Sequence, residues 1–579
     1  MEGSRKLDTA RSSPRQRALV LALATICFLG IVLRVSNAQT SSVNSPASLE
    51  QLFQQQRWHD VVREAEAQDT RSADVEYYYG TALAQLGRWD DAAKAFRRGL
   101  MLAPDDKRFP IELGGVAYKQ KHNREALTWL RRGIEIDPFD SYANDFLATI
   151  YFVHGNLEAA LKYWNRIKKP FIEEIQTDRE LKIRPVLLDR AFAFSPANEL
   201  RLSDYRTTKR RLEGLGIFAL YRISLVAGDD TRFAATFDGK ERDGAGDGKW
   251  GALLGVFRGL PYQTVYPEYF NIGGEAKNFT SLIRWDAQKR RVAADFSSPL
   301  EGNPKYRYQF DLDLRNENWD IRPSFKGAAP LLGGLNLRTE ALGGRVESFN
   351  SGRWGWTTGA EFSHRDYRSV FAGSGLSPDV LLSGFQLKHL AELNYQLMRV
   401  PERRISMESS ISLQTAAIWS TPRHTFEKLQ GRLSGEWSPQ LNGDDYKVQQ
   451  TLRAGTTFGQ APFDELFMLG LERDNDLSMR AHIATHDGRK GSAPLGGNYM
   501  LSNWEIDKHV YNNGIFGLKL SPFLDTGRIN GPTPGLGSKK WLWDTGVQTK
   551  ISVLGVGITF TYGKDLRSGN NAFYVTTSR

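Results

Sequence analysis

The stretch YRYQFDLDLR, residues 306–315, decides the fold of the C-terminal half of the chain. Its aromatic and aliphatic residues occupy every second position, and arginine, glutamine and aspartate fill the positions between them. Side chains alternate between the two faces of a β-strand, so this pattern predicts a strand with one apolar and one polar face. FQLKHLAELNYQL (385–397) alternates in the same way, with His389 alone on the apolar face.

The same period of two continues from about residue 250 to the end, as in ISVLGVGITFTYG (551–563). A soluble sandwich would also alternate. A membrane barrel is favoured by the length of the segments, by an N-terminal signal segment, and by tryptophans near segment ends that suit interfacial girdles. A sheet in lipid has to close, because an open edge leaves unpaired amides. We therefore expect residues 250–579 to form an antiparallel transmembrane barrel of about 16 strands, at roughly 20 residues per strand and turn. The tryptophans are Trp285, Trp319, Trp437 and Trp504.

The N-terminus has the features of an export signal. Basic residues precede an apolar segment, residues 18–33, that is shorter than the roughly 20 residues a membrane-spanning helix needs. Ser36-Asn37-Ala38 then places small residues where signal peptidase cleaves. We expect a cleaved signal peptide at 1–38; an uncleaved inner-membrane anchor is the alternative. Cys27, the one cysteine of the chain, lies in this segment, so the mature chain would have neither thiol chemistry nor disulfides.

The bulk composition excludes two classes of protein. A mean hydropathy of -0.45 argues against a bundle of membrane helices. The net charge is +10, but the basic residues are scattered, whereas nucleic-acid binding requires a clustered basic face. No nucleic-acid partner is therefore expected.

Residues 46–172 contain a repeat of 34 residues. Ala92, Ala126 and Ala160 keep this spacing, and so do several other positions. The pattern resembles the tetratricopeptide repeat, in which small residues lie where paired helices cross and a proline ends the second helix. We expect an α-solenoid, with a degenerate pair at 49–68 capping its start. The concave face of a solenoid binds peptides or partner domains, although simple scaffolding remains open.

A small α/β module is expected at 180–242. PVLLDRAFAFS (185–195) predicts a strand, and LSDYRTTKRRLEGLG (202–216) predicts a helix that stops at Gly216. Residues 218–228 and 231–240 predict a hairpin. The order strand, helix, strand, strand resembles a POTRA module, the periplasmic domain that precedes outer-membrane assembly barrels. Other small α/β linker domains share this pattern.

The segments 266–300, 314–320 and the run from LERDNDLSMRAH (471–482) to the end resemble the BamA/TamA-like outer-membrane surface-antigen superfamily. With the POTRA-like module, the resemblance covers roughly residues 180–579. It implies that a long loop folds into the barrel lumen and carries an (I/V)-R-G-(F/Y) motif. The matching residues are Met479, Arg480, Ala481 and His482, so the arginine is kept and the glycine and aromatic are not. The family's acidic partners of that arginine correspond to Glu505 and Asp525.

Physical chemistry supports this pairing independently. An arginine in a lumen with restricted water requires partners, and its planar fork suits two carboxylates. The alternative is that Arg480 is solvated and that Glu505 and Asp525 are ordinary lumen-facing polar residues. On either reading the charged stretch 471–482 is no catalytic cluster.

Enzymatic and metal chemistry find little support in the sequence. His482 and His486 have the spacing of helical zinc ligands, with Asp487 beside them, but this segment is predicted to lie between strands. No G-x-S-x-G, P-loop or H-E-x-x-H motif occurs. We therefore expect no catalytic residues, no metal and no cofactor.

The resemblance implies a bacterial outer-membrane protein with its N-terminal domains in the periplasm, in contact with lipid and with periplasmic or outer-membrane polypeptides. It would insert or translocate polypeptides. An exporter of surface polysaccharide is the alternative, because repeat-plus-barrel chains also occur there, and a structural anchor is a third possibility. Family barrels usually end on an aromatic residue; here Phe573 and Tyr574 precede the final Arg579 by several positions.

Overall fold

The computed structural model describes residues 48–177, 180–228, 232–245, 249–322, 331–371, 376–440, 445–513, 516–531, 536–538, 540–553 and 556–578. The signal-peptide prediction for residues 1–38 concerns residues outside this set. The chain divides into two compact units, one ending at Phe171 and the other beginning at Ile172.

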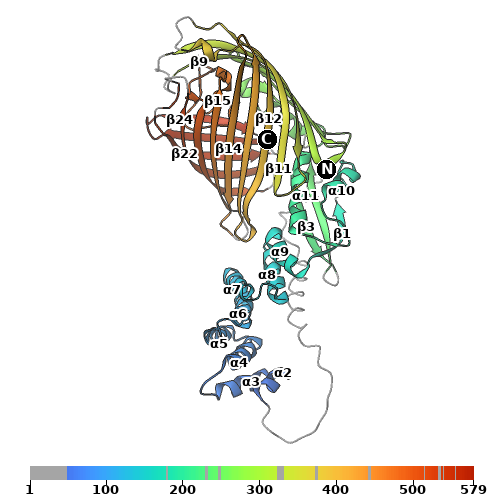
Figure 1. Ribbon diagram of the computed structural model, residues 1–579. Coiled ribbons are helices and arrows are strands. Elements are labelled where there is room, and N and C mark those ends of the chain that lie inside the picture. The colour runs from blue at the N-terminus through green and yellow to red at the C-terminus, as the bar shows by residue number, and fades with distance from the viewer. Residues whose placement is uncertain are drawn as a thin grey trace, which may run out of the picture. The chain divides into compact units, whose positions relative to one another are not determined.

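The first unit consists of antiparallel helix pairs, which are stacked in Figure 1. Small residues sit at the crossings, as the repeat predicts. A Cβ at Gly80 would lie 2.6 Å from the Phe96 ring, and one at Gly114 would lie 2.7 Å from Leu130. The helices are α2 (Leu49–Gln54), α3 (Trp58–Glu66), α4 (Ala73–Gln85), α5 (Trp89–Leu102), α6 (Arg108–Lys119), α7 (Asn123–Ile136), α8 (Ser141–Val153) and α9 (Leu157–Trp164).

Among the residues the structure describes, no helix combines the length and the apolar character needed to cross a membrane.

The second unit begins with a small four-stranded sheet in the order β2-β1-β4-β3. One sequence prediction is wrong here: residues 185–191 form a helix and not a strand. Pro185 occupies the first turn, where its missing N–H costs nothing, and Leu187, Leu188 and Ala191 form a buried helical face. The elements are β1 (Phe171–Thr177), α10 (Pro185–Ala191), β2 (Asn198–Glu199), α11 (Leu202–Leu215), β3 (Phe218–Ala227) and β4 (Arg232–Glu241).

The missed strand is β1, which starts before the expected module boundary at residue 180. Its sequence, FIEEIQT, has too few apolar residues to signal a strand. The predicted helix at 202–216 and the predicted hairpin are present, and Gly216 ends α11 with a φ of 69°.

Apart from β16 (Phe467–Met468) and β19 (Leu495–Gly496), which pair only with each other, the remaining strands form one large, mainly antiparallel sheet whose cyclic order is that of a closed barrel, with β9 beside β10 and β24 beside β5. Eighteen segments take part, against the sixteen expected, and β5, β17 and β18 have only two residues each. Figure 1 shows the long strands curving around one interior. The bounds are β5 (Thr264–Val265), β6 (Glu268–Ile272), β7 (Lys277–Trp285), β8 (Lys289–Leu300), β9 (Asn303–Ile321), β10 (Gly333–Ser348), β11 (Trp354–Arg368), β12 (Gly384–Val400), β13 (Ile405–Trp419), β14 (His424–Trp437), β15 (Tyr446–Gly459), β17 (Thr485–His486), β18 (Arg489–Lys490), β20 (Asn498–Asn512), β21 (Phe516–Asn530), β22 (Leu542–Val553), β23 (Val556–Asp565) and β24 (Asn571–Ser578).

The two faces of this sheet differ in chemistry. On β9, Phe310 is 56% exposed and Leu312 and Leu314 are also exposed, whereas Asp313 on the other face pairs with Arg291 of β8 at 2.7 Å. The outer face carries exposed large apolar side chains on nearly every long strand. Trp285, Trp437 and Trp504 belong to this exposed set. Trp319 does not, because it is 7% exposed and packs edge-on against Phe463 at 5.2 Å.

The small sheet and its helices dock on one end of the barrel. Arg307 of β9 donates to the Gly214 carbonyl at 3.1 Å, and Asn278 of β7 donates to the Leu215 carbonyl at 2.9 Å. A Cβ at Gly214 would lie 2.7 Å from the Phe349 ring, so the missing side chain permits this close approach. The C-terminal end of α11 is therefore fixed to β7, to β9 and to Phe349, which follows β10.

Candidate functional site: the loop inside the barrel

The loop between β15 and β20, residues 460–497, is an excursion from the sheet. The two strands pair directly with each other, as Thr451 does with Asn503, so the sheet continues without the loop. The loop lies against inner faces. Its Met479 is fully buried, in a cluster with Leu501 and Ile529, and its Lys490 pairs with Trp319 of β9. Residues 471–482, the charged stretch singled out in the sequence, lie in the middle of this loop.

Arg480 meets both predicted carboxylates. Its Nη2 donates to Asp525 Oδ1 at 2.6 Å and its Nε donates to Asp525 Oδ2 at 3.0 Å, while Nη1 donates to Glu505. Its backbone N–H also donates to Asp525 Oδ2 at 3.0 Å. The guanidinium lies 4.0 Å from the centre of the Phe523 ring. Arg480 is 9% exposed and Asp525 is fully buried, so this pair is shielded from solvent screening.

The next two residues extend these contacts to the following strands. The backbone N–H of Ala481 donates to Asp544 of β22 at 2.7 Å. His482 Nδ1 lies 2.7 Å from an oxygen of Asp544, and Nε2 lies 3.5 Å from an oxygen of Asp565 on β23. A histidine thus stands where the family motif has an aromatic residue, between two carboxylates.

His482, Asp544 and Asp565 are also the set of described residues whose atoms lie close enough together to hold a metal ion. Their arrangement suits a proton better. The two carboxylates face different ring nitrogens, and a protonated imidazole donates from both nitrogens, whereas one metal ion would need the ligands to converge. His486 contacts its own neighbour Asp487 at 3.2 Å and is not part of this set.

The acidic residues of the stretch pair with the strands that begin the barrel. Glu472 accepts from Lys289 at 3.0 Å. Asp474 accepts from Arg284 at 3.0 Å and from Arg291 at 2.5 Å, and Lys490 lies 3.6 Å away.

The basic residue between these two acids takes a different kind of partner. The guanidinium of Arg473 lies 3.5 Å from the centre of the Tyr262 ring. Contacts of the stretch 471–482 therefore reach β7 and β8 near the start of the barrel and β22 and β23 near its end.

Ion pairs also hold the loop near its start, at Glu465, and near its end, at Lys490. Glu465 lies 2.7 Å from Lys388, 3.3 Å from Lys428 and 3.4 Å from Arg365. Lys490 pairs with Glu317 of β9 at 2.8 Å. Each of these residues is at least nine-tenths buried.

Sequence reasoning brought together Arg480, Glu505 and Asp525, and it missed the partners of Glu472, Asp474 and His482. One signal was present in the sequence: Asp544 lies in WLWDTG (541–546), which shares its DTG with the LDTG that contains Asp525. A second missed residue is Gly563 of β23. A Cβ there would lie 3.0 Å from the Arg480 carbonyl, so the bare backbone makes room for the loop.

Comparison with known families matches a tetratricopeptide repeat to residues 79–141, which confirms the repeat prediction over that segment. Comparison with curated proteins finds no match. Three solved structures are similar over most of the chain. CdiB from Escherichia coli is 14% identical, covers 71% of this chain and 75% of its own, and has a TM-score of 0.46.

CdiB from Acinetobacter baumannii is 12% identical, covers 93% and 99% of the two chains, and has a TM-score of 0.43. BamA from Haemophilus ducreyi lacking POTRA domains 1–3 is 12% identical, covers 70% and 84%, and has a TM-score of 0.41. TM-scores below 0.5 carry no functional inference, so the function proposed below rests on the chain's own topology and contacts.

Proposed function

We propose that this chain is an outer-membrane barrel protein that inserts or translocates polypeptides. One observation carries the proposal: a long, charged loop packs against the inner faces of strands whose outer faces expose large apolar side chains. Such an outer face suits lipid, and such an inner face suits a polar path that the loop occupies. We propose Arg480, with Glu505 and Asp525, as the central contact that holds the loop there.

The N-terminal units supply the binding functions in this proposal. The small sheet and its helices run in the order β1-α10-β2-α11-β3-β4, which adds a helix and a two-residue strand to the strand, helix, strand, strand order of the POTRA resemblance. They contact β9 and β7 through Gly214 and Leu215. The helical repeats offer a concave surface for periplasmic partners. A signal peptide would direct the chain to export. No step of this role requires a catalytic residue, a metal or a cofactor.

Depletion of the protein in its host tests the proposal. The outer-membrane and secreted proteome should lose specific polypeptides, while the surface glycan profile stays unchanged. Loss of a surface glycan with an unchanged proteome would contradict the proposal and would support export of a polysaccharide. Complementation should succeed with the wild-type chain and should be impaired with Arg480→Ala.

A further inference from the structure

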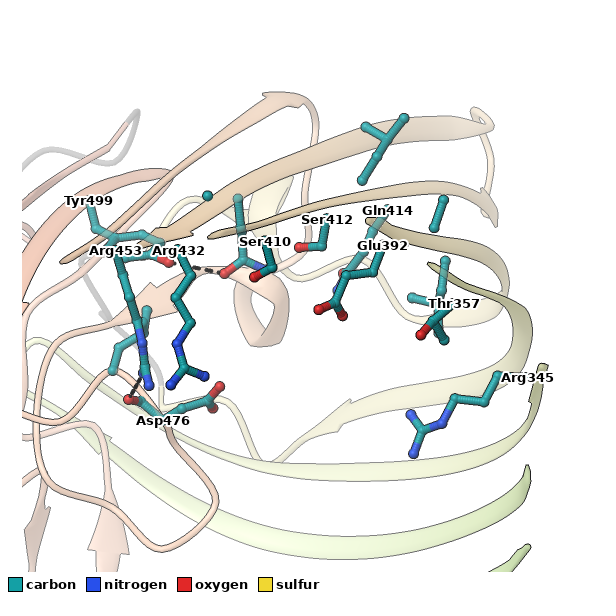
Figure 2. Close-up of a pocket in the computed structure, with 16 residues that line it drawn as sticks. Arg345, Thr357, Glu392, Ser410, Ser412, Gln414, Arg432, Arg453, Asp476 and Tyr499 are labelled. Carbon is teal, nitrogen blue, oxygen red and sulfur yellow. Dashed lines mark hydrogen bonds between the residues drawn. The ribbon is translucent and has the colours of Figure 1, made fainter. Parts of the chain in front are cut away.

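The loop leaves a polar cavity of about 340 Å³ beside the inner wall formed by β10 to β15. Figure 2 shows this cavity with Arg345 of β10 on one side and with Arg432 of β14 and Arg453 of β15 on the other. Hydroxyl and amide side chains line the wall between them, as Ser410, Ser412 and Gln414 do. Its chemistry therefore suits a hydrated polar or charged ligand.

In the part of the chain that the structure describes, the three arginines have no carboxylate partner. Among the described residues, no carboxylate oxygen within 4.0 Å of Arg345, Arg432 or Arg453 is recorded, although most buried charges elsewhere in the lumen are paired. Arg432 donates to the Ser434 hydroxyl at 2.9 Å. The Nε of Arg453 is buried and has no hydrogen-bond acceptor among the described residues.

Arg432 and Arg453 are also direct neighbours across the sheet, because β14 and β15 place them opposite each other in register. Like charges directly opposite each other destabilise a sheet. A pair of this kind is stabilised when an anion lies between the two guanidinium groups.

The loop reaches this pair without neutralising it. Arg453 donates to the backbone carbonyl of Asp476, and both arginines point toward Asp476 in Figure 2. A carbonyl oxygen is a weaker acceptor for a guanidinium than a carboxylate is. The Asp476 carboxylate lies beyond ion-pair distance of any described cation, and Glu392, the other acid of the cavity, lies on β12.

We propose that Arg432 and Arg453 form an anion site in the lumen that binds carboxylates of a polypeptide passing through the barrel, with Arg345 on the opposite wall as an auxiliary contact. The proposal rests on the proposed function, since it names the chemical class of client segment that the lumen recognises: an extended, acidic one. Asp476 covers the site while the loop is in its present position.

The test uses the full chain in nanodiscs and fluorescein-labelled hexaglutamate, with binding measured by fluorescence anisotropy at fixed ionic strength. Hexaglutamate should bind, and its affinity should fall at least tenfold in the double variant Arg432→Gln/Arg453→Gln. The charge-retaining variant Arg432→Lys/Arg453→Lys should keep most of the affinity. Labelled hexalysine should show no binding that depends on these two residues.

The matched control is Arg338→Gln, on β10 with Arg345. Arg338 is seven residues from Arg345 and so lies on the other face of the strand. This variant should bind hexaglutamate as the wild type does.

Unchanged hexaglutamate affinity in a double variant that keeps wild-type heat-modifiable mobility would overturn the proposal. Equal loss of affinity in the lysine and glutamine variants, both with wild-type heat-modifiable mobility, would also overturn it, because charge would then not be the determinant. The outcome is separable from the proposed function, since the depletion experiment reads the proteome and does not depend on this site.

Discussion

Two regions of the barrel interior treat buried charge in opposite ways. Where the loop meets β7 to β9 and β20 to β23, most acidic and basic groups have a partner of opposite charge, as Arg480 has Asp525 and Glu472 has Lys289. On β14 and β15, Arg432 and Arg453 face each other with no recorded carboxylate within 4.0 Å among the described residues, although Lys428 of β14 pairs with Glu465 near the start of the loop. Paired charges hold a fixed element in place, whereas unpaired charges leave binding capacity for a ligand.

Removing Arg480 should have the largest effect on the paired side. Arg480→Ala leaves Asp525 buried and without its guanidinium, which costs about 3–5 kcal/mol for a partly or fully buried pair. The temperature at which the heat-modifiable band of the folded barrel disappears on a gel should therefore fall. Arg338→Ala is the control: Arg338 forms an exposed ion pair with Glu340 on the outer face, so its removal should leave that temperature unchanged.

Asp474 should have the next largest effect. Asp474→Asn removes the carboxylate that Arg284 contacts at 3.0 Å. The other two cations near Asp474 retain a carboxylate partner, because Arg291 also pairs with Asp313 and Lys490 also pairs with Glu317. A loss of about 1–3 kcal/mol is expected for a buried charge left without its partner. Trypsin should then cleave after Arg473 faster than in the wild type. Asp487→Asn is the control, because Asp487 is 85% exposed in the same loop and should leave cleavage unchanged.

Glu112 on α6 extends the comparison to the helical unit, since it has no ion pair or hydrogen bond with the described residues. Burial raises the pKa of its carboxyl from 4.5 to about 7. Between these two pH values the folded unit keeps the proton of Glu112, whereas the unfolded chain has released it. The contribution of this proton to the stability of the fold is therefore complete below about pH 4.5 and is lost as the pH rises through 7.

Glu112→Gln should accordingly stabilise the helical unit by about 1–2 kcal/mol at pH 8, the shift being discounted because the side chain is partly exposed. The advantage should shrink at pH 5. Hydrogen exchange of α6, compared between variant and wild type at each pH, measures the difference. An equal advantage at both pH values would show that the carboxyl titrates normally.

Gly563 should give the smallest effect. In Gly563→Ala the new methyl group would lie 3.0 Å from the Arg480 carbonyl, so the loop has to shift by a few tenths of an ångström at a cost of about 1 kcal/mol. Hydrogen exchange at Arg480 and Ala481 should rise modestly. Gly431→Ala, on β14 where a Cβ meets open space, should leave this exchange unchanged.

The sequence predicted those parts of the fold that depend on periodicity. The 34-residue spacing of Ala92, Ala126 and Ala160 indicated the helix pairs, and the alternation at 306–315 indicated strands with one apolar face. Periodicity could not identify short elements with few apolar residues. The strand β1 was therefore missed, and the helix α10 was predicted as a strand. Trp319 was assigned to an interfacial girdle because it lies near a segment end, but it is on the inner face of β9, where the loop residue Phe463 packs against it.

In the candidate site, Arg480, Glu505 and Asp525 could be predicted from the resemblance to a family motif and from the requirement that an arginine in the lumen has carboxylate partners. The partners that Glu472, Asp474 and His482 have on the barrel strands lie between 62 and 190 residues away in sequence. Only the curvature of the sheet brings these positions together, and a single sequence carries no record of that proximity.

Hydrogen–deuterium exchange of the loop peptide 471–484 in the folded, wild-type barrel tests the central claim most directly. Among the hydrogen-bonded amides of this peptide, those of Arg480 and Ala481 donate to Asp525 and Asp544 of the barrel wall, and those of Leu471 and Ala484 donate to carbonyls within the loop. A clamped loop predicts that they exchange slowly and that Arg480→Ala releases them. Complete exchange within seconds in the wild-type barrel would contradict a loop held inside the lumen by paired charge.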